Sequence, residues 1–509
     1  MTGRDAYDVA VVGAGHNGLA CAALLAKAGL SVAVFERSDR VGGAAVSEPL
    51  WSGYTVSAAS YVCTLLDPWL IEELDLERHG YSAYRKDPAT FNVLADGRSL
   101  LLGSDESANE REIAAFDRGD VEGFHELDLV LRRLGSALFD TFSDPEPKFG
   151  RFSPRTQELL CGSAAEIVEQ YVRTPVLQAA VATDGIIGTF RGPRDAGTGY
   201  VLAHHYAGRA LGVQGAWGYV RGGMGAISDA LAGAAREYGA QIFSDAEVET
   251  FMYRGDRIAG VVLRDGSEIL AGAVASNAHP RTTFLDLAGE AHLDPAFAQR
   301  VRAWESAGPS FKLNLALGEL PDFLSRPGSK PAAHHHATIH VASSVDYLQT
   351  AYEDAKARGI SRRPMIECFM QTPTDPSLAP SGKHILSIFA QYYTYEAAAA
   401  MTSDQRNAEA DRIVALISEF APNVRNAIEG RQIFTPADLE TRFGLIGGHI
   451  FHGELLPGQI YEHRFSTRTP LRNLYLCGSG AHPGGCVSGF PGKRAAAAIL
   501  ADMRALSSV

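Results

Sequence analysis

The chain has 509 residues, and 46% of them are hydrophobic, which is enough for two or three domains and a large core. Its net charge of −13 argues against a nucleic-acid partner, because binding to phosphates needs a basic face. No run of about 18 uncharged apolar residues predicts a membrane-spanning helix, and a strand that begins by Asp8 leaves no room for a signal peptide. The six cysteines are scattered, without redox-pair or zinc spacing, so we expect a cytoplasmic protein and no metal site.

The N-terminal segment predicts a βαβ unit that binds a dinucleotide. Residues 8–12 are an apolar run typical of a buried parallel strand, and Gly13, Gly15 and Gly18 form G-x-G-x-x-G directly after it. Glycine is needed there because a Cβ atom would block the approach of a pyrophosphate to the N-terminus of the next helix. We expect this helix to end at Gly29.

The second strand of this unit carries the signal that selects the nucleotide. It covers residues 31–35 and ends at Glu36, about 20 residues after the glycines, where an acidic side chain can bind a ribose hydroxyl. Arg40, Gly42 and Gly43 then form R-x-G-G, which resembles the extension after the ribose acid in the amine oxidase and phytoene desaturase flavoproteins. We therefore predict FAD as the cofactor.

A second glycine-rich turn lies in the middle of the chain. Residues 221–225 have the sequence R-G-G-M-G and precede a predicted helix over 226–238. In the resembling flavoproteins, a valine at the start of the following strand holds the adenine through its backbone, which implies this role for Val248. An Asp-Gly pair at 265–266 predicts a hairpin turn, and the strand after it leads to Asn277.

Strand-like runs recur in the second half of the chain and predict a sheet beneath a substrate cavity. They lie at residues 311–317, 338–341, 365–370 and 384–391. Lys312 lies in a strand that resembles the amine oxidase strand whose lysine holds a water near flavin N5, which implies a part in hydride acceptance or in reoxidation by oxygen. The alternative is a lysine paired with a carboxylate at a domain edge.

The end of the chain repeats the order of strand, glycine turn and helix. Residues 473–477 predict the strand, 478–485 the turn and 490–506 an alanine-rich helix, which must lie close to another element. The segment resembles the closing FAD motif of the same flavoproteins, and the helix dipole can stabilise negative charge on a reduced flavin. His482, in the turn, either donates a hydrogen bond or moves a proton near the flavin, or it holds the turn itself.

Four further runs extend the resemblance over nearly the whole chain. They are A-T-D-G-I-I-G at 182–188, G-Y-V-L-A-H-H at 199–205, Q-G-A-W-G-Y at 214–219 and G-H-I-F-H at 448–452. With the FAD motifs, they make the chain resemble the phytoene desaturase-like flavoproteins. Within these, it is most similar to the group of pyridine nucleotide-disulphide oxidoreductase domain-containing protein 2 and the bacterial carotenoid ketolases. Disulphide chemistry is not expected, because no two cysteines have the close spacing of a C-x-x-C-like redox pair.

The motifs and the resemblance together define the candidate site. The residues predicted to bind FAD are Gly13, Gly15, Asn17, Gly18, Glu36, Arg37, Arg40, Gly42, Gly43, Ala44, Gly223, Met224, Val248, Asn277, Gly478, Ser479, His482, Gly485, Val487 and Phe490. The residues predicted to take part in catalysis are Lys312, His482 and His449. We expect His449 to project into the cavity together with His452. Five ring residues either line an apolar pocket near the cofactor or belong to the core: Tyr200, His204, His205, Trp217 and Tyr219.

The interruptions in the FAD pattern predict the domain organisation. Residues 1–65, 215–285 and 470–509 would form a discontinuous FAD-binding domain, and 66–214 and 286–469 the substrate-binding domain, with mainly helical patterns in the first of these two segments. The expected fold class is α/β. It combines a Rossmann-type FAD-binding domain, like that of glutathione reductase and amine oxidase, with an interleaved α+β substrate domain.

Three functions remain open from the sequence. The first is an FAD-dependent oxidoreductase that desaturates or oxidises an apolar substrate, such as a polyene, terpenoid or lipid, with oxygen or a quinone as electron acceptor; the substrate class rests on the resemblance. The second is an amine oxidase, which shares the FAD motifs. The third is a non-catalytic FAD-binding protein that acts through a partner. Peripheral membrane contact and the oligomeric state stay open.

Overall fold

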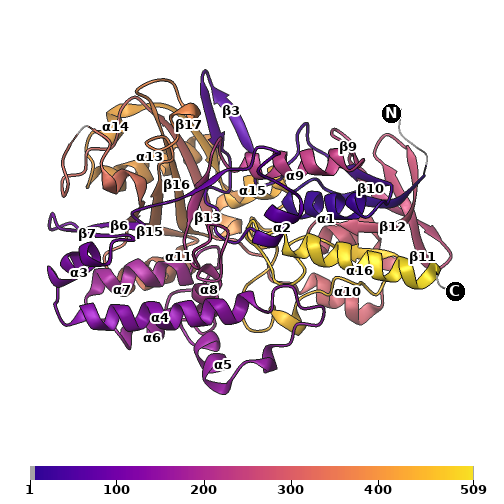
Figure 1. Cartoon of the computed structure of the whole chain (residues 1–509). Helices are drawn as coiled ribbons and strands as arrows, with labels where there is room; N and C mark the ends of the chain where they lie inside the picture. The colour runs from indigo at the N-terminus through magenta and orange to yellow at the C-terminus, as the bar shows by residue number, and fades with distance from the viewer. Residues whose placement is uncertain (1–5, 329, 508–509) are drawn as a thin grey trace.

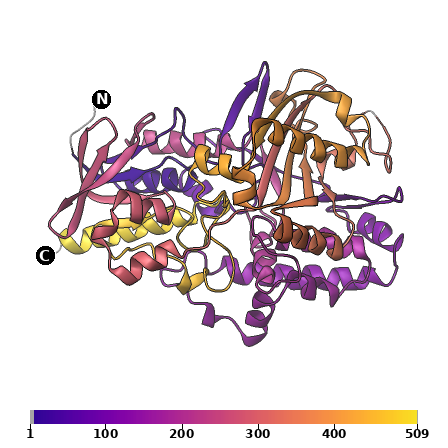
Figure 2. The same cartoon turned by 180° about the vertical axis from the view of Figure 1, so that it is seen from behind.

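The computed structural model describes residues 6–328 and 330–507 of the chain. Most of its strands form two large sheets, which lie at the right and the left of Figure 1, and four short strands form two small two-stranded sheets. The view from behind in Figure 2 shows the same arrangement and places both ends of the chain beside the first sheet, away from the second. No helix within the described residues is long and apolar enough to cross a membrane.

The first sheet has seven strands, and its centre is the parallel sheet that the N-terminal motif predicts. Its order is β10 (Val248–Arg254), β11 (Arg257–Leu263), β12 (Glu268–Ser276), β1 (Ala6–Val12), β2 (Val32–Phe35) and β9 (Gln241–Phe243), and β18 (Leu474–Leu476) also pairs with β12. One edge of β12 is used twice, because residues 268–270 pair antiparallel with β11 and residues 274–276 pair parallel with β18. The sheet therefore takes strands from the beginning, the middle and the end of the chain.

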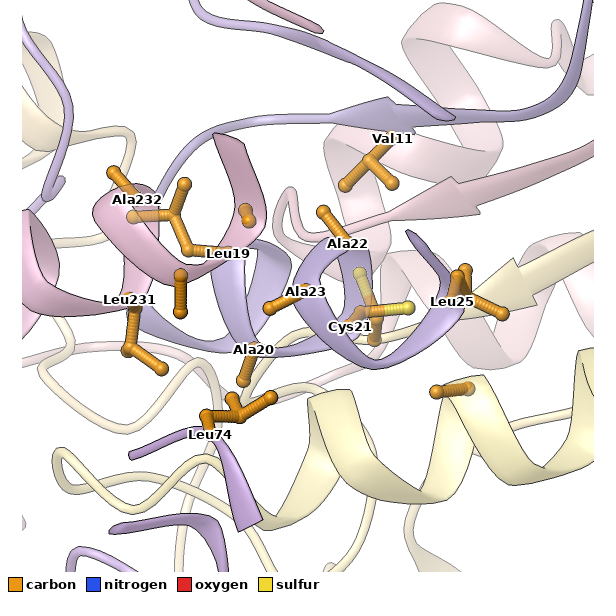
Figure 3. Close-up of a cluster of buried hydrophobic side chains, with 14 of the residues drawn as sticks. Val11, Leu19, Ala20, Cys21, Ala22, Ala23, Leu25, Leu74, Leu231 and Ala232 are labelled. Carbon is orange, nitrogen blue, oxygen red and sulfur yellow. The ribbon is translucent and has the colours of Figure 1, made fainter. Parts of the chain in front are cut away.

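Three helices cover one face of this sheet: α1 (His16–Lys27), α9 (Gly225–Glu237) and α16 (Phe490–Ser507). Figure 3 shows the small side chains of α1 between Val11 of β1, Leu231 and Ala232 of α9, and the yellow helix α16. Small residues are required because a Cβ atom at Gly492 of α16 would overlap the carbonyl oxygen of Asn17 in α1. The alanine-rich end of the chain thus lies against another helix, as predicted.

This close contact makes a specific prediction. Gly492→Val is expected to lower the free energy of unfolding by about 2–3 kcal/mol, because the backbone of α1 cannot move away from the added methyl groups without disturbing the core. Ala497→Val, on the exposed side of the same helix, is the matched control and should change stability by no more than about 0.5 kcal/mol. Denaturant unfolding of both variants measures the difference, and equal midpoints would contradict the packing argument.

The second sheet also has seven strands and is antiparallel except for one pair. Its order is β17 (Ile428–Phe434), β13 (Ser310–Leu317), β16 (His384–Tyr393), β15 (Ile360–Phe369), β14 (Thr338–Val341), β6 (Thr90–Val93) and β7 (Ser99–Leu102), with β14 and β6 parallel. The four runs predicted in the second half of the chain are β13 to β16. The sequence did not predict β6 and β7, because each has only four residues and helical patterns surround them.

The two faces of this sheet differ in chemistry. In β13, Phe311, Leu313 and Leu315 point to one face and join the core beneath α13 (Ser403–Ser418). The alternate residues Ser310, Lys312 and Asn314 are polar, and each is at most 2% exposed. A polar face that is fully buried must be covered by other parts of the protein, and here it faces the interior between the sheet and the rest of the molecule.

The remaining elements complete the walls around this interior. Figures 1 and 2 place the helices α3 to α8 below the second sheet. Their bounds are α3 (Glu106–Ala114), α4 (Asp120–Phe139), α5 (Pro154–Cys161), α6 (Ala164–Glu169), α7 (Pro175–Ala182) and α8 (Thr198–His205). The other elements are β3 (Ser47–Trp51), β4 (Tyr54–Ser57), α2 (Pro68–Glu73), β5 (Ala83–Arg85), β8 (Gly218–Val220), α10 (Pro295–Arg302), α11 (Val345–Arg358), α12 (Tyr395–Ala399), α14 (Val424–Ala427) and α15 (Pro436–Phe443).

Candidate functional site

A cavity of about 750 Å³ is lined by residues of both sheets. The part formed by the first sheet and the loops beside it contains many of the residues predicted to bind FAD. These are Gly13, Gly15, Asn17, Glu36, Arg37, Arg40, Gly42, Gly43, Ala44, Val248, Asn277, Ser479 and Val487. We call this part the nucleotide part of the cavity. Residues from three distant segments of the sequence thus meet on one wall.

The glycine turn after β1 is packed too closely for side chains. A Cβ atom at Gly18 would overlap the carbonyl oxygen of Gly13, and one at Gly15 would lie 2.7 Å from Nδ2 of Asn277. Glu36 connects the end of β2 to this turn, because its Oε2 accepts a hydrogen bond from the backbone N–H of Ala14 at 2.7 Å. The turn leads directly into the N-terminus of α1, where backbone N–H groups favour a phosphate.

Seven of the residues predicted to bind FAD do not line the cavity. Gly223 and Met224 lie at the start of α9, where the backbone N–H of Met224 donates to Oγ of Ser57 at 3.0 Å. Three more are glycines that are packed too closely for a side chain: a Cβ atom would overlap Gly13 at Gly18, Asn277 at Gly478 and Phe451 at Gly485. Phe490 packs edge-on against Phe139 and Phe142. The seventh is His482, whose contacts are described below.

Several buried polar atoms on the wall have no hydrogen-bond partner in the described structure, which is rare in folded proteins. They are Nε2 of His16, Oδ1 of Asn17, Oγ of Ser60, Oγ of Ser310 and Nδ1 of His452, and all five residues line the cavity. Together with the glycine turn and the N-terminus of α1, they fit a long and polar ligand such as FAD.

The rest of the cavity, which we call its inner part, is mainly apolar and aromatic. Its wall is formed by Tyr61, Val62, Thr64, Leu65, Ile187, His205, Trp217, Lys312, Phe389, Ile450 and Phe451. Of the five ring residues considered from the sequence, His205 and Trp217 lie on this wall, whereas Tyr200, His204 and Tyr219 are not part of it. Tyr61 and Phe389 were not among the candidates. The alternation of β16 carries a signal for Phe389, whereas nothing in the sequence distinguishes Tyr61.

Lys312 is the catalytic candidate that the structure brings to the wall. It is 2% exposed, its Nζ donates to Oγ of Ser387, and the same Nζ lies 4.5 Å from the ring centroid of Tyr61. Oγ of Ser387 donates in turn to Oδ1 of Asn314 at 2.8 Å. Burial lowers the pKa of Lys312 to about 7, so its amine can gain or lose a proton near neutral pH. The alternative interpretation, a lysine paired with a carboxylate, requires an acidic partner, whereas the hydrogen-bond partner of Lys312 is the hydroxyl of Ser387.

The two histidine candidates lie elsewhere. His482 is 2% exposed, its Nε2 lies 3.1 Å from the carbonyl oxygen of Thr141, and its ring packs on Tyr461, so it holds the turn and does not line the cavity. His449 is fully buried, with Nε2 3.5 Å from Oε1 of Glu454. His452 lines the wall and His449 does not; the backbone at His452 has a φ of 57°.

Sequence reasoning missed Arg464, which joins the loops beside the cavity. Its buried guanidinium donates to the carbonyl oxygens of Phe451, Glu454, Gln459, Ser479 and Ala481. Burial lowers its pKa to about 10, so the group stays charged at neutral pH. No motif marks this arginine in the sequence, because its partners are backbone atoms and carry no signal of residue type.

A Rossmann-type sheet with FAD motifs on a shared wall, closed by a second sheet, defines an FAD-dependent oxidoreductase. The family model described as flavin containing amine oxidoreductase matches residues 18–500. The chain belongs to this family, and FAD is its cofactor.

Individual relatives agree with the resemblance found in the sequence, which is thereby confirmed. The chain is 39% identical to pyridine nucleotide-disulfide oxidoreductase domain-containing protein 2 of Rattus norvegicus, over 98% of this chain and 94% of that protein. It is 26% identical to a phytoene desaturase (lycopene-forming) of Paracoccus sp., over 97% of each chain. A triple mutant of putrescine oxidase has a TM-score of 0.67 at 18% identity and covers 98% of this chain and 99% of that chain, which confirms the fold class.

Proposed function

We propose that the protein removes a hydride from a neutral, apolar substrate of the polyene, terpenoid or lipid type, and passes the electrons to oxygen or a quinone. The observation that carries this proposal is the apolar and aromatic wall of the inner part. Ile187, Phe389 and Phe451 are each at most 4% exposed, and they would surround a substrate with hydrocarbon surface and exclude water from it. The phytoene desaturases among the relatives support the same class of substrate.

The charges on the wall favour a neutral substrate over an amine. All the carboxylates that line the cavity among the described residues belong to its nucleotide part or to the segments beside it: Glu36, Glu48, Glu247, Glu249, Asp286 and Glu440. The basic groups of the inner part are Lys312 and His205. An ammonium substrate would therefore meet Lys312 without a carboxylate on the same wall, which is unfavourable in a site that excludes water.

The residues of the chain have separate tasks in this reaction. FAD, when bound, supplies the acceptor for the hydride. The glycine turn and the N-terminus of α1 hold its pyrophosphate, and the apolar wall orients the substrate. In the desaturation of a C–C bond, one carbon loses a hydride and its neighbour loses a proton. The neutral form of Lys312 can take up that proton at Nζ.

The test is to mix the FAD-loaded protein with candidate substrates without oxygen and to follow the loss of the oxidised flavin absorbance. We expect a polyene to reduce the flavin, and Lys312→Met to slow that reduction by about 100-fold or more, because it removes the proton acceptor. Lys383→Met is the matched control, since Lys383 pairs with Glu429 outside the cavity, and its rate should equal that of the unchanged protein.

Two other outcomes would each overturn the proposal. Fast reduction by simple amines, with none by polyenes, would indicate an amine oxidase. A flavin that no small molecule reduces would indicate an FAD-binding protein that acts through a partner.

A further inference from the structure

Three polar side chains lie in a row across the interior face of the second sheet. Asn314 of β13 is directly opposite Ser387 of β16 on one side and Gln432 of β17 on the other. Directly opposite residues of antiparallel strands point to the same face of a sheet, so the row lies on the face that also carries Lys312. Asn314 is fully buried and Ser387 is 8% exposed, which shields their hydrogen bonds from water.

The donor and the acceptor of each hydrogen bond in this row follow from the chemistry of the groups. A backbone carbonyl only accepts, so the side-chain atom of Asn314 that lies 3.0 Å from the carbonyl oxygen of Ala58 must be the amide nitrogen. The amide oxygen then lies 2.8 Å from Oγ of Ser387, and because an amide oxygen only accepts, Ser387 must donate its one proton to Asn314. The second N–H of the amide donates to Oε1 of Gln432 at 2.9 Å.

These directions determine what Ser387 offers to Lys312. Because its proton is already used, Oγ of Ser387 can only accept from Nζ of Lys312, and among the described residues it is the one hydrogen-bond partner of that amine. A neutral amine has two N–H groups and one lone pair. One N–H points to Ser387, and the face of the Tyr61 ring, whose centroid is 4.5 Å from Nζ, attracts the other. The lone pair is left for the cavity, which Lys312 lines.

The other ionisable groups that influence Lys312 are Tyr61, Glu367 and Cys368. Burial raises the pKa of Tyr61 and that of Cys368 far above neutrality, and it raises the pKa of Glu367 to about 8. In the described part of the chain, none of the three accepts a hydrogen bond from Nζ. Burial also lowers the pKa of Lys312 to about 7, so the neutral amine predominates at pH 9. The hydroxyl of Ser387 is therefore the group that can leave the lone pair free or occupy it.

We propose that Asn314 is a positioning residue that acts through Ser387: it accepts the hydrogen bond of the Ser387 hydroxyl and so keeps the lone pair of neutral Lys312 free to take up a proton from a ligand in the cavity. Without Asn314, the hydroxyl would turn to Nζ and donate to that lone pair. The inference rests on the proposed role of Lys312 as proton acceptor, and it names the residue that makes the amine available for this role.

The test is the rate at which acetic anhydride acetylates Lys312 in the FAD-loaded full chain. Mass spectrometry measures this rate from pH 6 to 9, relative to that of Lys383 in the same sample, whose side chain is 36% exposed. In this reaction the lone pair of Nζ forms a bond to a carbonyl carbon of the anhydride, acetate leaves and the amine loses a proton to solvent. The rate therefore reports the free lone pair. The reagent is smaller than the proposed substrates and can enter where they must.

Asn314→Leu is expected to lower the rate of Lys312 at pH 9 by about tenfold, because the freed hydroxyl occupies the lone pair. Ser387→Ala has no hydroxyl to donate and should keep the rate of the unchanged protein at this pH. The double variant Asn314→Leu/Ser387→Ala should recover that rate, which general damage to the sheet would not allow. Gln432→Leu is the matched control, since Asn314 still donates to Ala58 and keeps its orientation.

Three results would overturn the inference: no acetylation of Lys312 at pH 9 in the unchanged protein, an unchanged rate in Asn314→Leu, or a double variant as slow as Asn314→Leu. If Asn314→Leu does not retain FAD, Asn314→Ala replaces it, because it frees the same proton without adding bulk. The labelling needs no turnover. The inference can therefore fail while a polyene still reduces the flavin, and a flavin that no polyene reduces leaves the labelling result unchanged.

Discussion

Replacing Arg464 with lysine is expected to lower the free energy of unfolding by about 4 kcal/mol or more and to abolish retention of FAD. The guanidinium bonds five backbone carbonyl oxygens from two loops, 451–459 and 479–481. A lysine keeps the charge, but its single nitrogen has three donors and cannot reach both loops at once. Buried carbonyl groups would be left without partners, and the loops that carry Phe451 and Ser479 to the cavity would separate.

The matched control is Arg472→Lys, because Arg472 is an exposed residue of the same region, with its guanidinium 3.0 Å from Asp256. An exposed ion pair contributes little, so we expect a change of no more than about 0.5 kcal/mol. Thermal unfolding and the ratio of FAD to protein after purification measure both variants. An Arg464→Lys protein with unchanged unfolding midpoint and full FAD content would show that the two loops hold together without the guanidinium.

Gly15→Val is expected to abolish FAD binding while the protein stays folded. The backbone of Gly15 has φ −70° and ψ 164°, which valine adopts without strain, so the effect comes from the space that the side chain occupies. Its Cβ would lie 2.7 Å from Nδ2 of Asn277, and its methyl groups would enter the turn at the N-terminus of α1 where the pyrophosphate must approach. We expect at least a 100-fold loss of affinity, about 3 kcal/mol.

Ala28→Val, at the exposed end of α1, adds the same side chain away from the cavity and should retain FAD fully. Circular dichroism confirms that both variants are folded, and the flavin spectrum of the dialysed protein measures retention. A Gly15→Val protein with one FAD per chain would contradict the assignment of the pyrophosphate to this turn.

Much of the fold follows from local patterns. The apolar run before Gly13 predicts β1, the R-G-G-M-G turn predicts α9, and the alanine-rich end predicts α16, each within two residues of the observed bounds. β6 and β7 were missed because four-residue strands have too few alternating positions to be recognised. The cavity wall was harder to predict, since His449 and His452 are equally suited by residue type, and the sequence does not show that His452 lines the cavity while His449 does not.

The amino-acid sequence alone predicted FAD as the cofactor, because FAD recognition depends on glycines and an acid at set intervals within single segments, such as Gly13 to Glu36. It determined the family for the same reason, and Lys312 as a candidate. The positions of Lys312 on the cavity wall and of His482 away from it, and the contacts by which Arg464 joins the loops, are seen only in the three-dimensional structure. These depend on contacts between residues far apart in the chain and on burial from water, and neither leaves a periodic signal in the sequence.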